Sequence, residues 1–553
     1  MQGLVGGVGQ SGVTAVGSRD NIDVSTLRAW MRHMGSGEVS RPTFEWLEGG
    51  TLPQQFAETA IRFPHRRALA FPQEGVEQTH GQLDDAAGRL AGWLLTRNFA
   101  PGDRAILCGY NSLAFVIAYM AVLRAGGVVV LVDPALAAPE LAHLVDDSGA
   151  VVAFADSASG TTFRGSVATV VSLDEPLPKG LVAEPAAVDE DATAILAYTS
   201  GTTGTPKGVL LTHTNVLASV RAVTRSWRWS PDDVVFHALP LTHQHGLGGV
   251  NAALVTGSCA TVMRSFDPGT FVASAVESRA TVLLAVPAMY EWLLGAGVGL
   301  DTLMASRGGT LRLAVSGSAP LNQELFRRLA DCLGEPVLER YGTTESGLDV
   351  SNPYDGPRLS GCIGLPLPGV EVRIVAPDGT SVRSGENGEL LVRGPQVAHA
   401  YWMNPQATEE AIDEDGWFRT GDIAQSDSDS GYVRITGRIK ELIITGGYNV
   451  YPREVELVLE THPAVLEAAV AGVASDQWGE EVVAWIVPVA GGQLDTAELL
   501  AHAKARLASY KCPKQWAFVE RLPRNSLGKL LRKELRISPL ASRSDGAVSP
   551  VHE

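Results

Sequence analysis

Short apolar segments that alternate with helical patterns constrain the fold of this chain more than any other feature. Segments such as DRAILCG, GVVVLVD, AILAYTS, ATVLLAVP and LRLAVSG are separated by helical stretches such as LDDAAGRLAGWLLTRN. Alternation of this kind indicates parallel β-sheets covered by helices. Several of the segments end in serine, threonine or glycine. Because ligands bind beyond the carboxyl ends of strands in open α/β sheets, the sequence predicts a binding site there.

The length of 553 residues indicates several domains. After about Leu365 the segments VEVRIV, GELLVRG and YVRITGR alternate with turn signals, which predicts a β-rich subdomain. We therefore predict an α/β fold. A large N-terminal domain of stacked α/β sheets, with the β-rich subdomain, covers residues 41–438, and a small mobile α+β C-terminal domain covers residues 439–537. Residues 1–40 are predicted to form a flexible arm with one short helix, and residues 538–553 a disordered tail.

Composition excludes some classes of function. The chain has 44 Lys and Arg against 61 Asp and Glu, a net charge of -17, which argues against a nucleic-acid binder. The most apolar stretch, Phe115 to Leu123, is too short to span a membrane. The five cysteines form no CxxC pair, so we expect neither a disulfide framework nor a zinc site. We expect a cytoplasmic protein.

One segment combines glycine, hydroxyl groups and a lysine at the end of an apolar strand. It contains Thr199, Ser200, Gly201, Thr202, Thr203, Gly204, Thr205, Pro206 and Lys207. Glycines let the backbone approach a ligand closely, and the hydroxyl groups and the lysine suit a polyphosphate. The segment is not a Walker A loop, because no Gly-Lys-Ser/Thr stands at the required spacing. The alternative is a polar turn between a strand and a helix.

Five further segments follow in a fixed order: Ala314-Val315-Ser316-Gly317-Ser318-Ala319-Pro320-Leu321, Glu339-Arg340-Tyr341-Gly342-Thr343-Thr344-Glu345-Ser346, Gly416-Trp417-Phe418-Arg419-Thr420-Gly421-Asp422, Gly437-Arg438-Ile439-Lys440-Glu441 and Pro523-Arg524-Asn525-Ser526-Leu527-Gly528-Lys529. With these segments the sequence resembles the adenylate-forming superfamily of acyl-CoA synthetases, amino-acid adenylation domains and luciferases. The resemblance extends from about Phe44 to Leu535, which is nearly the whole chain.

The resemblance implies a role for each segment. The adenine side of a nucleotide site would be formed by Gly317, Ser318, Ala319, Pro320, Glu339, Arg340, Tyr341, Gly342 and Thr343. Thr344 and Glu345 would act at the reacting phosphate, with Glu345 as the Mg²⁺ ligand, and Asp422 would hold the ribose. Arg438 and Lys440 would stand at a hinge. Lys529 would be the mobile catalytic lysine, Gly446 and Gly447 would line a pantetheine tunnel, and His245 would face the acyl site.

The chemistry of these residues supports an ATP-dependent ligase. A carboxylate at neutral pH is a poor electrophile and needs a good leaving group, which attack on the α-phosphate of ATP supplies. Cations and donors placed at that phosphate lower the barrier. The implied reactants are a carboxylic acid, ATP with Mg²⁺, and coenzyme A as the thiol. The alternatives are an acyl carrier protein as acceptor, a luciferase-like oxidation, or a non-catalytic nucleotide-binding scaffold.

The acid stays open at this stage. The segment from His243 to Gly249, with the small residues Ala252 and Ala253 after it, either leaves room for a bulky acid or packs tightly. The segment Ser351 to Gly356 resembles malonyl-CoA synthetases in its sequence pattern. A second carboxylate needs an Arg or Lys in the pocket, and the sequence does not single one out.

Overall fold

The structure is a computed structural model and describes residues 23–34, 47, 49–199, 206–297, 299–305, 310–446, 448–475, 478–489, 494–524 and 529–535. In this part of the chain the α-helices are α1 (Val24–Met34), α2 (Leu52–Arg62), α3 (His80–Leu95), α4 (Leu113–Arg124), α5 (Ala138–Ser148), α6 (Gly160–Phe163), α7 (His213–Ser226), α8 (Gln244–Thr256), α9 (Pro268–Glu277), α10 (Pro287–Gly295), α11 (Thr302–Ala305), α12 (Gln323–Leu333), α13 (Pro405–Ala411), α14 (Pro452–Leu459) and α15 (Thr496–Lys504).

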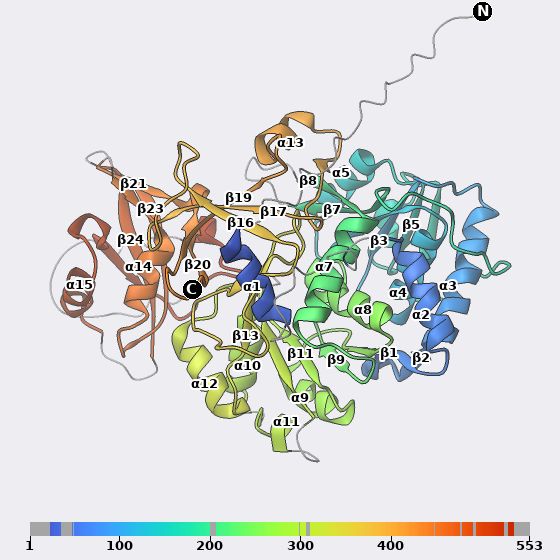
Figure 1. Ribbon diagram of the computed structural model, residues 1–553, viewed down its shortest axis with the longest axis horizontal. Coiled ribbons are helices and arrows are strands. Elements are labelled where there is room, and N and C mark those ends of the chain that lie inside the picture. Colours follow the sequence, from blue (N-terminus) through green and yellow to red (C-terminus); the bar gives the residue numbers. More distant parts are fainter. Residues whose placement is uncertain are drawn as a thin grey trace, which may run out of the picture.

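Two large sheets form the body of the molecule (Figure 1). The nine-stranded sheet has the spatial order β15 (Leu365–Pro366), β14 (Val350–Ser351), β13 (Leu338–Tyr341), β12 (Leu313–Ser316), β11 (Val282–Ala285), β9 (Val234–His237), β10 (Cys259–Val262), β1 (Arg67–Phe71) and β2 (Val76–Thr79). The seven-stranded sheet has the order β18 (Ala400–Tyr401), β8 (Lys207–Thr212), β7 (Thr193–Thr199), β4 (Val128–Val132), β3 (Arg104–Cys108), β5 (Val152–Ala155) and β6 (Thr169–Ser172).

The centres of both sheets are parallel, whereas both edges of the nine-stranded sheet and the β8–β18 edge of the seven-stranded sheet are antiparallel. β13, β12, β11, β9, β10 and β1 run parallel in the first sheet, and β7, β4, β3, β5 and β6 in the second. The predicted α/β class is confirmed. Every strand named from the sequence alone is present, so the rule that ligands gather at the carboxyl ends of parallel strands applies to this molecule.

The main core lies between the two large sheets and is built on helices that are apolar on most sides. α4 has the sequence LAFVIAYMAVLR and contacts α3, β1, β3 and β4. A helix that is hydrophobic all round needs burial on all sides, which two flanking sheets provide. Its start is fixed by Ser112, whose side chain accepts a hydrogen bond from the backbone N–H of Phe115 at 3.1 Å.

The predicted β-rich subdomain is a four-stranded antiparallel sheet. Its strands are β16 (Glu371–Val375), β17 (Gly388–Arg393), β19 (Phe418–Ser426) and β20 (Val433–Arg438), in this spatial order. In the pairing of β19 with β20, Asp422 stands opposite Arg438. The last strand of this subdomain therefore ends beside a predicted site residue.

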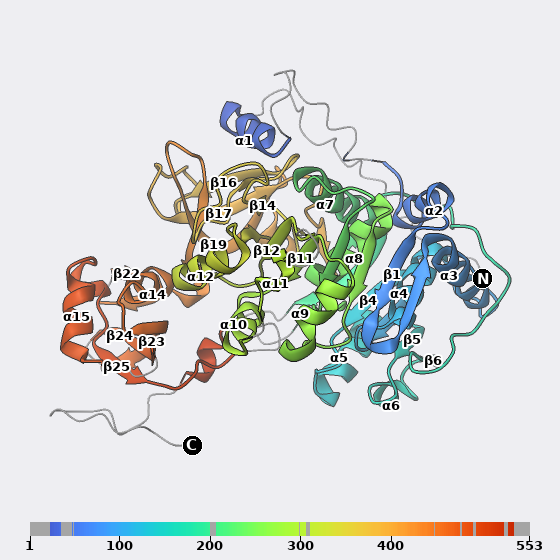
Figure 2. The same cartoon turned by 90° about the horizontal axis from the view of Figure 1, so that it is seen from below.

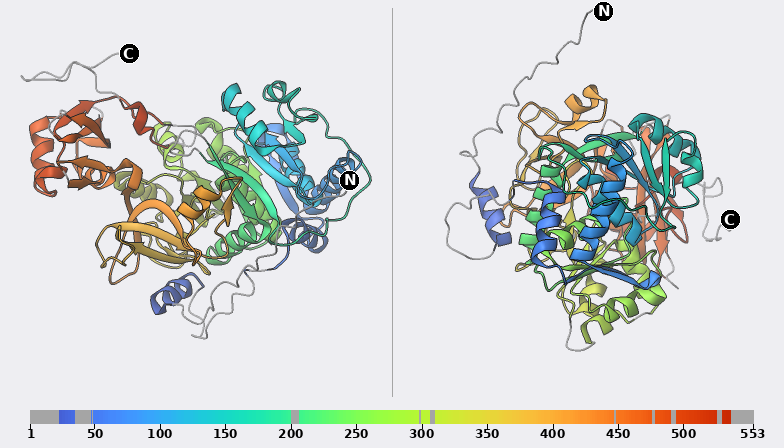
Figure 3. Two further views of the ribbon diagram at one scale, coloured as in Figure 1. Left: turned by 90° about the horizontal axis from the view of Figure 1, so that it is seen from above. Right: turned by 90° about the vertical axis from the view of Figure 1, so that its right-hand side faces the viewer.

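The C-terminal part of the chain has its own sheet and core, at one end of the long axis of the molecule (Figure 3). Its strands are β21 (Ile443–Thr445), β22 (Tyr448–Val450), β23 (Val465–Ser475), β24 (Gly479–Pro488) and β25 (Gln515–Phe518). Buried side chains of β23 and β24 pack against α14 and α15 in a cluster separate from the main core. The short 3-10 helices are η3 (Pro72–Glu74), η5 (Ile439–Glu441), η6 (Ser509–Lys511) and η7 (Arg532–Glu534). The domain boundary at residue 439 stays a prediction.

Helix α1 lies against β15, the edge strand of the nine-stranded sheet, and against α7, next to the β-rich subdomain (Figure 2). The indole N–H of Trp30 donates to the carbonyl oxygen of Val370 at 2.8 Å. The buried His33 places its Nε2 3.1 Å from the carbonyl oxygen of Leu365. Arg228 of the loop after α7 donates to the carbonyl oxygen of His33 at 2.8 Å. The short helix expected in the N-terminal arm is thus present, and it is docked. The rest of residues 1–40 and the tail at 538–553 lie outside the described residues.

Two further expectations concern membranes and cysteines. No helix in the described part of the chain combines the length and the apolar character that a bilayer crossing requires. All five cysteines are free thiols, and all but Cys332 are buried.

Candidate active site

The loop after β12 meets the start of α8. At Gly317 an added Cβ would lie 2.4 Å from Nε of Arg340, so the backbone must be glycine for the arginine to pass. Ser318 has a positive φ of 67°, which is uncommon for a residue other than glycine. Its hydroxyl oxygen lies 3.1 Å from Nδ1 of His245. Ala319 and Pro320 continue the loop toward the surface. The structure therefore brings the predicted adenine-side loop and the predicted acyl-site histidine together.

Strand β13 presents its predicted site residues on two faces. Side chains alternate along a strand, so Glu339 and Tyr341 share one face and Arg340 takes the other. The hydroxyl of Tyr341 donates to Asp422 Oδ2 at 2.6 Å. Glu339 accepts from the backbone N–H of Gly361 at 3.1 Å, and burial raises its pKa to about 8. Its carboxyl thus lies away from the group that surrounds Arg340.

Asp422 connects the β-rich subdomain to this strand. Its Oδ1 lies 2.7 Å from Nε of Arg438, the residue opposite it on β20. Its Oδ2 accepts from Tyr341. Burial, and after it the carboxylate of Asp422, hold the pKa of Tyr341 well above its ordinary value, so the phenol remains a donor. Three predicted site residues from three strands thus form one hydrogen-bonded group.

The turn after β13 carries Thr344 and Glu345. An added Cβ at Gly342 would lie 2.0 Å from the carbonyl oxygen of Gly347, so the turn closes only with glycine there. The turn is held from both sides. Gln244 of α8 donates to the carbonyl oxygen of Thr344 at 2.7 Å. The backbone N–H of Ala398 donates to the carbonyl oxygen of Glu345 at 2.7 Å. The carboxylate Oε1 of Glu345 accepts from the hydroxyl of Tyr401 at 3.0 Å.

The predicted phosphate segment is described only at its two ends. Thr199 ends β7 and pairs with Lys207, which begins β8. The residues between them that we predict to bind phosphate, Ser200, Gly201, Thr202, Thr203 and Gly204, lie outside the described residues. Nζ of Lys207 lies 5.4 Å from the centre of the Tyr401 ring. Lys207 and Glu345 are thus joined through one aromatic side chain.

Several buried polar atoms near the start of α8 lack a hydrogen-bond partner among the described residues. They are Nε2 of His237, Nε2 of His245, Oγ of Ser316 and Nε of Arg340. Arg340 is 9% exposed, and no carboxylate in the described part of the chain pairs with it. Burial lowers the pKa of Arg340 to about 10. Burial, followed by the charge of Arg340, lowers the pKa of His245 well below its ordinary value, so this imidazole is neutral at pH 7. Buried polar groups without partners indicate a place for a polar ligand.

Lys529, from the C-terminal part of the chain, lies within electrostatic reach of the groups above. Partial desolvation and then the neighbouring Arg438 lower its pKa, while the carboxylates of Asp422, Glu441 and Glu345 oppose the shift. Two of these carboxylates belong to the predicted nucleotide site. Lys529 is therefore electrostatically coupled to the predicted nucleotide site in this structure.

The predicted thiol face lies on the turn between β21 and β22, and the predicted hinge residue Lys440 lies in η5. Gly446 forms the turn between β21 and β22 with a φ of 57°, and its N–H donates to the carbonyl oxygen of Trp478 at 2.8 Å. Gly447 lies outside the described residues. Ile444 and Tyr448 beside the turn are 54% and 58% exposed, so the turn presents an apolar surface to solvent. Lys440 lies in η5, directly after Arg438 and Ile439.

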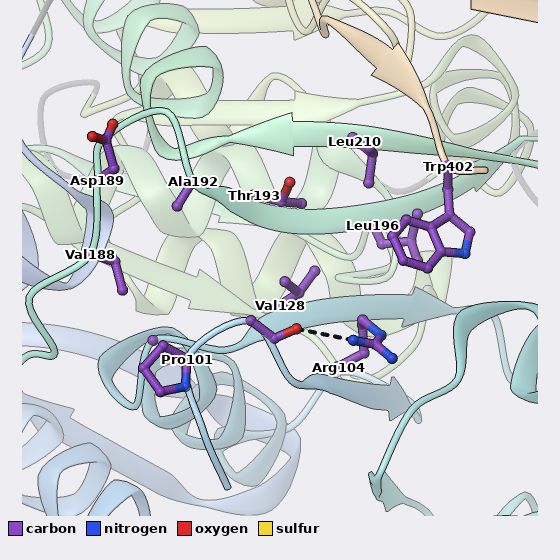
Figure 4. Close-up of a pocket in the computed structure, with 12 residues that line it drawn as sticks. Pro101, Arg104, Val128, Val188, Asp189, Ala192, Thr193, Leu196, Leu210 and Trp402 are labelled. Atoms are coloured by element: carbon purple, nitrogen blue, oxygen red, sulfur yellow. Dashed lines mark hydrogen bonds between the residues drawn. The ribbon is translucent and has the colours of Figure 1, made fainter. Parts of the chain in front are cut away.

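A pocket of about 370 Å³ opens on the seven-stranded sheet (Figure 4). Leu196, Leu210 and Trp402 line it and belong to a different apolar cluster from Tyr401. The pocket is therefore on the face of the sheet opposite the predicted site. The guanidinium of Arg104 in its wall donates to the carbonyl oxygens of Ser148 and Gly149 at 2.8 and 3.0 Å. The positive charge of Arg104 therefore contacts carbonyl groups at the carboxyl end of α5.

Two residues at the site were not predicted from the sequence. Tyr401 and Gln244 contact Glu345 and the backbone of Thr344, yet each is distant from that turn in the chain. Gln244 lies within the segment His243 to Gly249, which we considered for the acyl site, but it was not singled out there. Tyr401 lies in YWMNP, which has the appearance of a turn after a β-segment. Only the pairing of β18 with β8 brings it to the phosphate segment.

Comparison with known proteins agrees with this geometry. A family model described as AMP-binding enzyme matches residues 56–402, and one described as AMP-binding enzyme C-terminal domain matches residues 454–529. Feruloyl-CoA synthase from Amycolatopsis sp. is 36% identical over 86% of this chain and 96% of its own length. The mitochondrial malonate–CoA ligase ACSF3 from Homo sapiens is 36% identical over 78% of this chain and 81% of its own length.

Solved structures agree as well. The crystal structure of ATP-bound MatB from Rhodopseudomonas palustris superimposes with a TM-score of 0.80 at 34% identity, over 88% of this chain and 98% of that one. The sequence resemblance to adenylate-forming enzymes is therefore confirmed. The chain belongs to the family of AMP-binding enzymes and, within it, to the adenylate-forming CoA ligases.

Proposed function

We propose that the protein is an ATP-dependent acyl-CoA synthetase that forms an acyl-adenylate, releases pyrophosphate and transfers the acyl group to coenzyme A. The placement of Lys529 within electrostatic reach of Asp422 and Glu345 carries the proposal. It joins a cation from the C-terminal part to the carboxylates of the large N-terminal part. Attack of a carboxylate on the α-phosphate builds negative charge, and a fixed cation at that point lowers the barrier.

The residues of the site divide the work of the first half-reaction. Lys529 would contact both the acid and the α-phosphate, and Lys207 with Thr199 would hold the outer phosphates. Tyr341 and Asp422 would hold the nucleoside. Asp422 is already oriented by Tyr341 and Arg438, so little rearrangement is needed when the ribose hydroxyls arrive.

The site fits one Mg²⁺ ion shared with a polyphosphate. The carboxylate of Glu345 accepts a hydrogen bond from Tyr401 through Oε1. No group of three or more potential ligand side chains gathers anywhere in the described ranges. A single carboxylate matches the way Mg²⁺ is bound by one or two carboxylates together with phosphate and water. Bound there, the ion would neutralise charge on the phosphates.

For the acid we propose a short dicarboxylic acid. A buried arginine without an acidic partner is unfavourable, and a ligand carboxylate would relieve that cost through charge-assisted hydrogen bonds. His245, Ser316 and Ser318 add polar atoms near the same position. An aromatic acid such as ferulate would leave Arg340 unpaired, whereas malonate would bring the missing carboxylate. The relatives include enzymes named for each of these acids, and Arg340 favours the second.

For the second half-reaction we propose that the turn at Gly446 enters the site after a rotation of the C-terminal part near Lys440. Lys529 and Gly446 lie on different elements of that part, so one rotation exchanges them. We propose coenzyme A as the acceptor because the curated relatives are CoA ligases.

The test is pyrophosphate release with ATP and Mg²⁺ over a panel of acids, with and without coenzyme A. We expect release with malonate or a similar dicarboxylate, together with an acyl-CoA product. Release without an acyl-CoA product would contradict the acceptor, and release only with aromatic or fatty acids would contradict the acid class. No pyrophosphate release with any acid of the panel would contradict the proposal.

The Arg340→Leu variant tests the acid class within the same assay. Truncating one partner of a buried charge pair commonly costs several kcal/mol, so we expect kcat/KM for the dicarboxylate to fall by about 100-fold or more. The affinity for ATP, measured by calorimetry without acid, should stay unchanged. An equal fall in kcat/KM for monocarboxylic acids would show that Arg340 does not bind the second carboxylate.

A further inference from the structure

Tyr401 stands between two residues of the predicted phosphate site that are far apart in the chain. Its hydroxyl donates to Glu345 Oε1 at 3.0 Å. The face of its ring lies 5.4 Å from Nζ of Lys207, a distance typical of a cation–π contact. One side chain thus contacts the proposed Mg²⁺ ligand through its polar end and the phosphate-binding lysine through its ring.

The backbone holds Tyr401 in this place. Strand β18 pairs antiparallel with β8, with Tyr401 opposite Val209. The next residue, Trp402, donates from its backbone N–H to the carbonyl oxygen of Gly208 at 2.7 Å and from its indole N–H to that of Asp147 at 2.9 Å. Neighbouring side chains of a strand point to opposite faces, so Trp402 lines the pocket on the far face and anchors the strand from behind (Figure 4).

The segment that leads into β18 also holds Glu345 by its backbone. Ala398 donates to the carbonyl oxygen of Glu345 at 2.7 Å, and Tyr401 donates to its carboxylate. Glu345 is thus held by one short segment at two points, its backbone carbonyl and its carboxylate. Burial, and then the neighbouring Glu345, raise the pKa of Tyr401 far above its ordinary value, so the hydroxyl keeps its proton and donates at every working pH.

We propose that Tyr401 is a positioning residue, whose hydroxyl orients Glu345 for Mg²⁺ and whose ring orients Lys207 for the phosphates. The proposal rests on the proposed use of ATP with Mg²⁺. It predicts that the two ends of one side chain serve two ligands. The hydroxyl acts on the metal alone, whereas the ring acts on the phosphates even without the metal.

Two variants separate these roles. Tyr401→Phe removes the hydroxyl and keeps the ring, and Tyr401→Leu removes both. The matched control is Tyr432→Phe, because the hydroxyl of Tyr432 donates to the carbonyl oxygen of Pro357 outside the site. The first measurement is the calorimetric affinity for ATP with and without Mg²⁺. The second is the Mg²⁺ concentration that gives half-maximal pyrophosphate release.

For Tyr401→Phe we expect the gain in ATP affinity from Mg²⁺ to fall by about 10-fold and the half-maximal Mg²⁺ concentration to rise by a similar factor, as for a lost hydrogen bond to a charged group. Affinity for metal-free ATP should not change. For Tyr401→Leu, affinity for metal-free ATP should fall as well, and Tyr432→Phe should match the wild type.

Two results would overturn the proposal. One is an unchanged Mg²⁺ dependence in Tyr401→Phe while the wild type shows a clear one. The other is an equal loss of affinity with and without Mg²⁺ in that variant, which would mean a merely structural role. If the wild type itself showed no Mg²⁺-dependent ATP binding, both this inference and the proposed function would fail. A wild type that binds ATP with Mg²⁺ but releases no pyrophosphate would contradict the proposed function alone.

Discussion

The surroundings of Arg340 could not be predicted from the motif in which it lies. It lies in the segment that resembles a nucleotide-binding motif, and we assigned it there from the sequence. In the structure it faces away from Tyr341 and packs against Gly317, with no carboxylate partner among the described residues. The alternation of side chains along β13 was a signal for this, but which face meets which neighbour depends on strand pairing.

Gly317→Ala should disturb the acid rather than the nucleotide. The added Cβ would lie 2.4 Å from Nε of Arg340, so the guanidinium must move. A displacement of about 1 Å at a reacting site can lower the rate about 100-fold, and we expect kcat/KM for the acid to fall by this order. Steady-state kinetics with varied acid and varied ATP measure the two effects separately.

The matched control for that variant is Gly295→Ala at the end of α10, because an added Cβ there meets nothing within 4 Å. It should leave both constants near the wild-type values. If Gly317→Ala raised the KM for ATP and left the acid unaffected, the position of Arg340 would have no bearing on the acid.

Helix α1 has a weak sequence signal, yet it is docked at a defined position in the structure. Its residues precede the part that matches the family model, and the sequence predicted only a short helix in a flexible arm. The structure docks it through Trp30 onto the carbonyl of Val370, just before β16, and through His33 onto the carbonyl of Leu365 in β15. Those carbonyls carry no side-chain signature, so the docking site was not predictable from residue types.

Docking of α1 should weaken in acid. Burial lowers the pKa of His33 to about 4, from an ordinary value of 6.5. Above pH 6.5 the imidazole is neutral whether docked or free, so its contribution is complete. As the pH falls from 6.5 toward 4, only the undocked helix takes up a proton, and docking loses stability. At pH 5 we expect docking about 30-fold weaker than at pH 7.5, from the two pKa values.

Hydrogen exchange of residues 24–34, corrected for the intrinsic effect of pH, measures this change. The control is His33→Gln, whose side-chain amide can still donate to the carbonyl oxygen of Leu365 but does not titrate. The variant should show the same protection at both pH values. A wild type with pH-independent protection would contradict the assignment to His33.

At the scale of the whole molecule, the orientation of the C-terminal part was not readable from the sequence. The strands and the order of the motifs could be predicted, because each depends on a local sequence pattern. The electrostatic coupling of Lys529 to the groups around Asp422 depends on how two separately folded parts meet. The same holds for Tyr401, whose partners Lys207 and Glu345 lie in other segments.

Lys529→Ala should separate the two half-reactions. Without the cation we expect adenylate formation, measured by exchange of pyrophosphate into ATP, to fall by at least about 100-fold. Thioester formation from supplied acyl-adenylate and coenzyme A should remain largely intact, because that step uses the other orientation. Loss of both activities in a folded variant would show that the two faces are not divided between the two steps.

The contact between the two parts should also respond to pH. Glu291 of α10 shares a hydrogen bond with Glu467 of β23, whose carboxylate lies 3.1 Å from Arg524. Burial, and then the charge of Glu467, raise the pKa of Glu291 well above its ordinary value. The facing orientation therefore binds a proton that separated carboxyls would release. It is favoured at low pH and loses stability as the pH rises through the raised pKa.

Glu291→Gln should remove this dependence, because an amide donates to Glu467 at every pH. The measurement is the ratio of the adenylate-forming rate to the thioester-forming rate, compared between wild type and variant from pH 6 to pH 9. The wild-type ratio should fall relative to that of the variant as the pH rises. Parallel profiles would show that this carboxyl pair does not bias the orientation.

The docking of α1 has a consequence for the order in which the chain matures during synthesis. The carbonyl groups that receive Trp30, His33 and Arg32 come 332 to 398 residues later in the sequence. At about 5–20 residues per second, the ribosome needs roughly 20 to 80 s to make that stretch. The helix therefore leaves the ribosome long before its binding surface exists. It cannot guide early folding, and it closes over the β-rich subdomain only after that subdomain has been made.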